Sequence, residues 1–357
     1  MRKGKLLKTE YRLGRPAAGK AIALKDAAGL SGLRIAVLPD FHDGDPELVL
    51  NMLKKDVPDL IMIPGDFIIG RFPEELAARE DMRLAIRIRE LDPVRFMRRL
   101  ITRKELPAVH TVEVPRTSAL SEPVPGELIM DHAHNAIAFL RGCAAIAPTY
   151  VSLGNHEYML TEHDLEKVRK TGVILVDNEW VEVDLAKNGE NRQVLAKNGE
   201  KQRILVGGLS AHKVTRYNRY RRICRAEGNV DRYPERDWKV YTSIPSDDTE
   251  WMADFEAQEG FKILLCHHPE YWCCKRPWLF RRPIDLVLAG HAHGGQIRIG
   301  RKRGLFAPGQ GLLAWLIEGV HEGPHGCMVI TRGVTNSAWP VPRIGTPCEL
   351  VYLEVEM

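Results

Sequence analysis

Short apolar runs that end in aspartate, asparagine or histidine are the feature of this sequence that most constrains its fold. Residues 33–39 and 60–64 are two such runs, followed directly by Asp40 and by Gly65-Asp66. Residues 46–55 lie between them and have the apolar spacing of an amphipathic helix. Apolar runs of strand length that alternate with amphipathic stretches predict a layered α/β fold.

The same patterns continue along the chain. Helices are expected at residues 73–90 and 127–141, and the capping-box spacing of Thr161 and Asp164 predicts the start of another. Further strands are expected at residues 150–153, 173–176, 181–185, 203–206, 262–266, 286–289, 327–331 and 350–355.

Composition excludes several classes of protein. The net charge of +4 arises from 51 Lys and Arg against 47 Asp and Glu, which is too balanced for bulk nucleic-acid binding. Seven cysteines without a CxxC motif argue against a zinc ribbon or a disulfide framework and for free thiols in a reducing cytosol. No signal-peptide-like or membrane-spanning apolar stretch is seen. We therefore expect a cytoplasmic protein, with peripheral attachment to a membrane left open.

Five motifs at the ends of apolar runs carry side chains that bind metals or transfer protons. They are Asp40-Phe41-His42, Gly65-Asp66, Gly154-Asn155-His156-Glu157, Cys266-His267-His268-Pro269 and Gly290-His291-Ala292-His293-Gly294-Gly295-Gln296. Carboxylate, imidazole and amide groups are ligands for divalent ions, and two such ions about 3.5–4 Å apart can hydrolyse phosphoesters. Asp66 is the best candidate for a carboxylate that bridges two ions, because it follows a strand and a glycine that permits a sharp turn.

Spacing gives partial information on the other ligands. Asp40 and His42 are two residues apart, so in an extended chain both side chains face one side, and His291 and His293 have the same spacing. By contrast, His132 and His134 lie on a predicted helix, where this spacing separates them by about 200°, and we interpret them as non-ligands.

The remaining motifs leave alternatives open. His267 and His268 are adjacent and face opposite ways in an extended chain, so we expect only one to be a ligand, and the pattern does not decide which. Asn155 can supply an amide oxygen, while His156 can donate a proton or stabilise charge on a phosphoryl group.

Taken in order, the five motifs resemble the D-x-H, G-D, G-N-H-[DE], H and G-H-x-H pattern of the calcineurin-like metallophosphoesterase superfamily. The stretches GHAHGGQ and GLFAPGQG and the ending VPRIGTPCELVYLEV look like one bacterial branch, similar to UDP-2,3-diacylglucosamine pyrophosphohydrolases. The resemblance implies a four-layer αββα sandwich in which helices flank two mixed β-sheets.

The resemblance also implies a role for each site residue. Its first ion would be held by Asp40, His42, Asp66 and His293, and its second by Asp66, Asn155, His267 and His291. His267 is thereby preferred over His268. His156 would be catalytic and would bind substrate together with Asn155, and Asp66 would be the residue on which the catalytic metals most depend.

The predicted organisation is a basic segment with an edge strand at residues 1–32 and a metallophosphoesterase domain at residues 33–357. Residues 72–127 are longer than the branch usually carries, which predicts an insertion that caps the site.

The predicted activity is hydrolysis of a phosphodiester or pyrophosphate by a hydroxide that bridges two divalent ions. Mn, Fe or Zn are expected first, and Mg, Co or Ni also suit these ligands. The alternatives are a nuclease of the same fold and a non-catalytic metal-binding scaffold.

Basic and aromatic clusters at residues 95–104, 216–225 and 275–282 bear on the substrate. They favour a lipid-linked phosphoester and peripheral membrane contact over a nucleic acid, although solvated surface charge explains such clusters equally well. The oligomeric state is not predicted.

Overall fold

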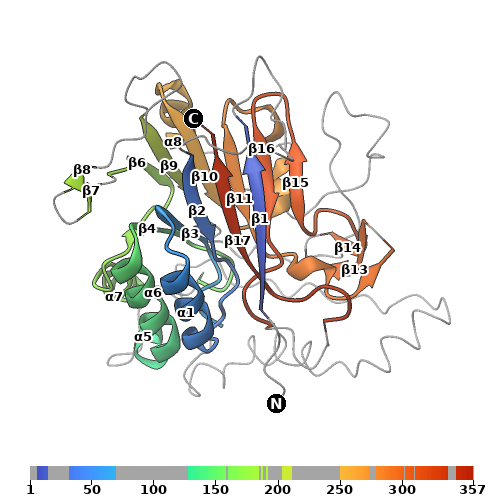
Figure 1. Cartoon of the computed structure of the whole chain (residues 1–357), viewed down its shortest axis with the longest axis horizontal. Coiled ribbons are helices and arrows are strands. Elements are labelled where there is room, and N and C mark those ends of the chain that lie inside the picture. The colour runs from blue at the N-terminus through green and yellow to red at the C-terminus, as the bar shows by residue number, and fades with distance from the viewer. Residues whose placement is uncertain are drawn as a thin grey trace.

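The computed structural model describes residues 6–14, 32–69, 128–157, 160–184, 186–187, 190–191, 203–210, 250–273, 279–300, 302–308, 310–336 and 343–356. Two six-stranded mixed β-sheets form its centre (Figure 1). The predictions of a helix at residues 73–90, of a capping insertion at 72–127 and of basic clusters at 95–104 and 216–225 lie outside the described residues, as do residues 275–278 of the cluster at 275–282.

The first sheet has the strand order β1-β17-β2-β3-β4-β5. Its strands are β1 (Leu7–Leu13), β17 (Glu349–Val355), β2 (Leu33–Val37), β3 (Leu60–Pro64), β4 (Thr149–Ser152) and β5 (Ile174–Leu175). All pairs are parallel except β17 with β2. The N-terminal strand β1 lies at the edge and pairs with the last strand of the chain, with Leu7 opposite Glu349.

The second sheet has the order β15-β16-β11-β10-β9-β6. Its strands are β15 (Gly319–Glu322), β16 (Cys327–Ile330), β11 (Leu286–Ala289), β10 (Phe261–Cys266), β9 (Ile204–Leu209) and β6 (Glu179–Glu182). The four central strands are parallel, and β6 and β15 are antiparallel at the two edges.

Helices cover the outer face of each sheet. Those against the first sheet are α1 (Pro46–Lys55), α5 (Ile129–His132), α6 (His134–Ile146) and α7 (Glu162–Arg169), which Figure 1 shows together on one side. The second sheet packs against α8 (Trp251–Ala257) and the 3₁₀ turns η3 (Pro269–Trp272) and η4 (Leu279–Arg281). A separate apolar cluster fills the space between the sheets. The four-layer αββα sandwich with two mixed sheets is therefore confirmed.

Local signals in the sequence explain several element ends. Thr161 and Asp164 form the capping box at the start of α7 as predicted, and Asp45 caps α1 by accepting a hydrogen bond from the Glu47 amide. The helix predicted at residues 127–141 is instead two helices, because Ala133 has a ψ of 52° between α5 and α6. His132 and His134 flank this break and are exposed.

A small third sheet packs beside the second. It consists of β12 (Arg298–Ile299), β13 (Arg303–Ala307) and β14 (Gly311–Ala314), all antiparallel. The turn η5 (His293–Gly295) lies directly before it. A two-stranded hairpin of β7 (Ala186–Lys187) and β8 (Glu190–Asn191) completes the described strands.

Candidate metal centre

The five motifs meet where strands of both sheets end. Asp40 follows β2, Asp66 follows β3 and Asn155 follows β4, while His267 and His291 follow β10 and β11 of the other sheet. The carboxyl ends of parallel strands lie at one edge of a sheet, so each sheet brings its motif loops to a common edge. Stacking of the two sheets then places the loops face to face.

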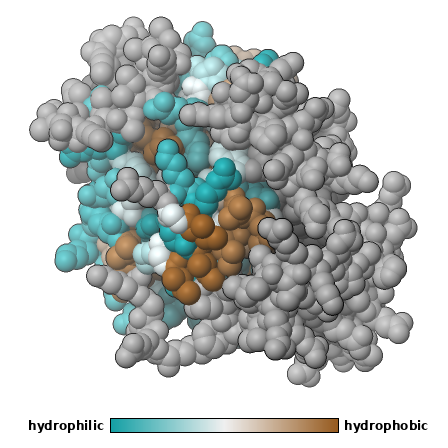
Figure 2. All heavy atoms as spheres, turned by 90° about the vertical axis from the view of Figure 1, so that its right-hand side faces the viewer, coloured by the Kyte–Doolittle hydropathy of each residue, from teal (hydrophilic) through white to brown (hydrophobic). Residues whose placement is uncertain are grey.

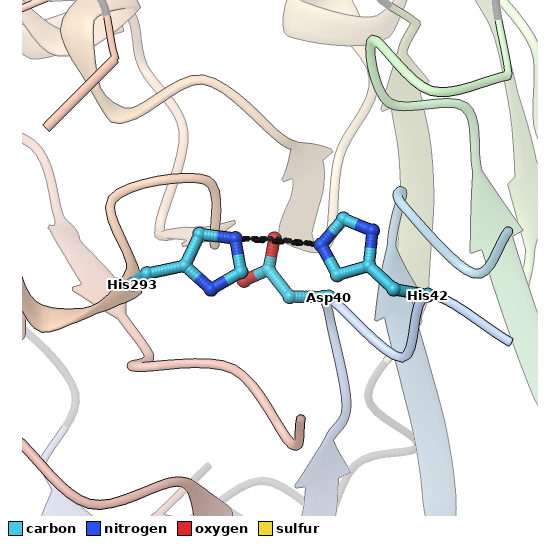
Figure 3. Close-up of side chains that lie close together, drawn as sticks. All are labelled: Asp40, His42 and His293. Carbon is cyan, nitrogen blue, oxygen red and sulfur yellow. Dashed lines mark hydrogen bonds and ion pairs between the residues drawn. The ribbon is translucent and has the colours of Figure 1, made fainter. Parts of the chain in front are cut away.

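One group of ligand atoms comprises Asp40, His42 and His293. Figure 3 shows the three side chains pointing toward one another, Asp40 and His42 from one loop and His293 from a loop far away in the sequence. His42 Nε2 lies 3.3 Å from His293 Nε2 and 3.8 Å from Asp40 Oδ1, and His293 Nε2 lies 3.6 Å from Asp40 Oδ1. These are the residues, apart from Asp66, that the family resemblance assigns to the first ion.

A second group comprises Asp66, His267 and His291. His267 Nε2 lies 3.0 Å from Asp66 Oδ2, and His42 Nε2 from the first group lies 3.8 Å from the same oxygen. The Asp66 carboxylate therefore lies next to both groups, as a bridging ligand must.

Hydrogen bonds to backbone carbonyls orient two of the imidazoles. His267 Nδ1 lies 2.8 Å from Pro64 O and His42 Nδ1 lies 3.3 Å from Ile68 O. A carbonyl oxygen only accepts, so each Nδ1 carries a proton and each Nε2 is directed into the site, where it is available to a metal once it is deprotonated. This arrangement is typical of metal-binding histidine.

Unsatisfied atoms provide a test of whether the residues fit a metal. Within the described part of the chain, Asn155 Oδ1 and His291 Nε2 are buried and have no hydrogen-bond partner. Buried polar atoms are normally paired, because leaving one unpaired costs about 1–3 kcal/mol. Both atoms belong to the set assigned to the second ion, so the donor set fits divalent cations.

The ligand loops have a strained backbone. Asp40, His42, Asp66, His291 and His293 all have φ between 47° and 66°. Asp40 and His42, and likewise His291 and His293, therefore do not lie on extended chain as expected, and turns direct their side chains. As a result, His291 and His293 enter different groups, although their spacing alone indicated one shared pocket. Such strain persists where the surrounding fold imposes it and is concentrated at functional sites.

Close backbone approach explains why glycine precedes the ligands. A Cβ atom on Gly154 would lie 2.2 Å from Asp66 Oδ1, and one on Gly290 would lie 2.6 Å from Asp40 Oδ2. Neither position has room for a side chain, so these glycines let the loops pack against the carboxylates.

Burial and neighbouring charges shift the pKa values of several side chains at the site. Although burial opposes its charged form, the neighbouring Asp66 and Asp40 raise the pKa of His267 to about 10. Burial raises the pKa of Asp40 to about 6, and burial followed by the charge of Arg343 lowers the pKa of His293 well below its usual range. Strong shifts of both signs in one cluster are typical of functional sites.

His156 differs from the ligands in its exposure. Its side chain is 24% exposed, whereas those of Asp66 and His267 are 2% and 0% exposed. Its Nδ1 lies 2.8 Å from Ile69 O, and its Nε2 lies 3.7 Å from Asp66 Oδ2, in a group of potential ligand atoms with His42 and Asp66. This position suits a group that meets a substrate from solvent.

Three buried residues at the site were not assigned a role from the sequence. Glu157 accepts hydrogen bonds from the amides of Asp66, Gly154 and Ile68 at 2.8, 2.7 and 3.1 Å, and so ties two ligand loops together. The sequence signal that could have predicted this role is the position of Glu157 directly after Asn155-His156. His268 and Glu270 form a further group with His291, which no spacing rule indicated.

Comparison with known proteins supports the same chemistry. Residues 125–295 match the family model described as Calcineurin-like phosphoesterase. This part of the chain is thus similar to calcineurin-like phosphoesterases. The match includes Asn155, His156, His267, His291 and His293 but begins after Asp40 and Asp66. Together with the ligand groups, it supports a metal-binding hydrolase.

Among curated proteins, none matches this chain. Solved structures that resemble it include the sulfate thiohydrolase SoxB of Thermus thermophilus in complex with glycerol, with 13% identity and a TM-score of 0.34 over 86% of this chain and 53% of that one. Another is a putative 5'-nucleotidase from Staphylococcus aureus in complex with alpha-ketoglutarate, with 12% identity and a TM-score of 0.37 over 90% of this chain and 54% of that one. This chain therefore spans about half the length of each, and similarity this low does not bear on its activity.

Proposed function

We propose that this protein is a dinuclear metal-dependent phosphoesterase that hydrolyses a phosphodiester or pyrophosphate bond. The observation that carries the proposal is the position of Asp66, whose Oδ2 lies 3.0 Å from His267 Nε2 and 3.8 Å from His42 Nε2. One carboxylate shared by two ligand groups is the arrangement that a pair of ions requires. Asp40, His42 and His293 would hold one ion, and Asn155, His267 and His291 the other.

Two divalent ions, when bound, would neutralise charge on the phosphate oxygens and ionise an attacking water. The protein residues would do the rest. His156 would place its Nε2 against the phosphoryl group or the departing oxygen and donate a proton there. The His156 amide donates a hydrogen bond to Asp66 Oδ1 at 3.0 Å, which holds the histidine beside the bridging carboxylate.

The finer identity of the substrate is a second part of the proposal. The GHAHGGQ stretch and the C-terminal sequence resemble the branch of UDP-2,3-diacylglucosamine pyrophosphohydrolases. We therefore place a lipid-linked pyrophosphate or diester first among substrate classes, ahead of single-stranded nucleic acid.

The test combines metal analysis with a substrate panel. The purified chain is stripped with a chelator, reloaded separately with Mn, Fe, Zn, Mg, Co or Ni, and assayed on a chromogenic monoester, a chromogenic diester, a nucleoside-diphosphate-linked pyrophosphate and single-stranded DNA. We expect two ions per chain and restored cleavage of the diester or the pyrophosphate. Strong cleavage of DNA alone would identify a nuclease, and metal binding without hydrolysis of any substrate would support a scaffold.

A further inference from the structure

Exposed apolar side chains gather on the small sheet beside the metal centre. Eight large apolar side chains are strongly exposed among the described residues, and five of them lie on this sheet or on the segment that pairs with it. These five are Ile299, Phe306, Leu312, Leu313 and Ile344, at 39%, 40%, 49%, 53% and 54% exposure. Figure 2 shows an apolar area on the side of the molecule where β13 and β14 lie. We call these five residues the β12–β14 face.

The five side chains come from neighbouring segments. Phe306 and Leu312 are directly opposite each other in the β13–β14 pair. Ile344 accepts a hydrogen bond from Arg298 and donates one to Gln296, so its segment runs beside β12. The five side chains therefore lie on neighbouring segments of one small sheet, which distinguishes them from the isolated exposed apolar residues that every protein carries.

The backbone of β14 adds to this exposure. Leu312 and Leu313 are consecutive, and in a regular strand their side chains would face opposite sides of the sheet. Leu313 instead has a φ of 58°, a conformation that costs a residue other than glycine about 1–2 kcal/mol. Both leucines are exposed as a result. A strained residue that holds an apolar side chain in water calls for a function.

The same small sheet also packs against the metal-binding loop. Ala307 and Ala314 form a buried cluster with Ala292, which lies between His291 and His293. A Cβ on Gly295 would lie 2.3 Å from the Gly304 Cα of β13, so the two backbones are in direct contact. Whatever binds the β12–β14 face is thereby held next to the candidate metal centre.

Charge identifies the class of partner. Residues 298–314 contain four basic side chains, Arg298, Arg301, Lys302 and Arg303, and no acidic one, and the charge of Arg298 is paired with Glu318. Lys302 and Arg303 are exposed at the start of β13. Apolar side chains next to a cluster of cations match a surface that is negatively charged outside and apolar beneath, which describes an anionic phospholipid bilayer.

Two other occupants fit less well. In a symmetric dimer the same face would meet itself, which would bring the basic residues of the two copies together. A protein partner is usually bound through Trp, Tyr and Arg, whereas four of these five apolar residues are Leu or Ile, and Leu is under-represented at such sites. We propose that the β12–β14 face docks this protein onto an anionic membrane surface, with the candidate metal centre beside the lipid head groups.

Vesicle flotation tests this docking without any hydrolysis. The full chain is mixed with vesicles of phosphatidylcholine alone or of phosphatidylcholine with phosphatidylglycerol. We expect binding to the mixed vesicles, weakened by salt, and little binding to phosphatidylcholine. The double variant Phe306→Gln/Leu312→Gln should bind the mixed vesicles at least about tenfold more weakly, because two apolar side chains no longer enter the bilayer.

Matched controls separate docking from general effects. Leu48→Gln/Val57→Gln removes two apolar side chains that are 45% and 55% exposed at α1 and just after it, and should bind as the wild type does. Lys302→Glu should weaken binding to the mixed vesicles by about fivefold or more, whereas Lys54→Glu on α1 should not. Metal content and thermal unfolding midpoint should be unchanged in the Phe306/Leu312 variant, which shows that it is folded.

Three results would overturn the proposal. The first is wild-type binding by the Phe306/Leu312 variant, and the second is an equal loss in the Leu48/Val57 control. The third is a change from dimer to monomer in the Phe306/Leu312 variant without a change in vesicle binding, which would make the face a contact between copies. An inactive protein that still binds vesicles through this face would refute the proposed hydrolysis alone.

Discussion

The two ends of strand β2 carry two clusters of charged residues that differ in burial and in how their charges are paired. At its amino end, Arg34 pairs with Asp56 through two hydrogen bonds and also contacts Glu10 and Glu354, at 3.2 and 3.0 Å. At its carboxyl end, Asp40 and the groups around Asp66 are almost completely buried. The first cluster is partly solvated, and each charge has an opposite partner.

The difference separates charge used for stability from charge used for function. Burying ionised groups costs several kcal/mol each unless partners repay it. At the Arg34 cluster, opposite charges repay most of that cost. At the metal centre, two carboxylates and several imidazoles lie close together, and some of their potential ligand atoms have no hydrogen-bond partner. The free-energy cost of burying these groups is therefore offset by the stability of the rest of the fold. Four substitutions test this contrast.

Asp66→Asn should have the largest effect. The neutral amide keeps the shape and the acceptor for the His156 amide but loses the charge that would bridge two ions. We expect fewer than two ions per chain and about a thousandfold lower activity, with a loss of stability in the metal-free protein because the buried His267 loses its charged partner. Metal analysis, diester hydrolysis and urea unfolding measure these outcomes. Full metal content in an active variant would contradict the bridging role.

His156→Ala should reduce turnover by about 10²- to 10⁴-fold, the usual contribution of a general acid. Metal content should stay close to that of the wild type, because His156 is proposed to act on the substrate rather than to bind a metal. Steady-state kinetics with metal analysis distinguish the two roles. The matched control is His132→Ala, an exposed histidine outside the site, and an inactive His156 variant that also lost its metals would overturn the assignment.

Glu157→Gln should have an intermediate effect. Glutamine can replace the oxygen that accepts the Asp66 and Gly154 amides, but its amino group would face the amide of Ile68. One buried donor left unpaired costs about 1–3 kcal/mol of stability, and we expect activity to fall about tenfold through displacement of Asp66. Urea unfolding and kinetics measure both, with Glu166→Gln on the exposed side of α7 as control. Unchanged stability would show that Glu157 does not hold the loops.

Asp56→Asn should have the smallest effect and none on activity. Partial burial opposes ionisation of Asp56, but hydrogen bonds from Lys8 and Arg34 lower its pKa below the ordinary value. A carboxyl with a lowered folded-state pKa stabilises the fold above its unfolded pKa of about 3.9, and that stability is lost as the pH falls through the folded value.

The variant should therefore be less stable by about 1 kcal/mol at neutral pH, and the difference from the wild type should shrink as the pH falls below about 4. Urea unfolding at both pH values measures it. A difference that grew with acid would contradict the ion pair as its source.

No helix in the described part of the chain combines the length and the apolar character needed to span a bilayer. Docking through the β12–β14 face would require only surface insertion.

Local chemistry in the sequence determined much of the fold. Strand β11 occupies residues 286–289 as predicted, and β10 begins one residue before its predicted start. The capping box placed the start of α7. These predictions succeeded because the periodicity of apolar residues and the capping of a helix depend only on a few neighbouring residues. Ala133 escaped prediction, because its non-helical backbone has no glycine or proline to mark it.

The sequence by itself determined which side chains are available for metal chemistry, since ligand types and their places after apolar runs are local properties. Only the tertiary structure decided how they are divided. Left-handed turns at Asp40, His42, His291 and His293 direct their side chains, and stacking of two sheets brings His42 to within 3.3 Å of a histidine 251 positions later. The β12–β14 face has the same origin, because exposure depends on what packs over a strand and not on the residues within it.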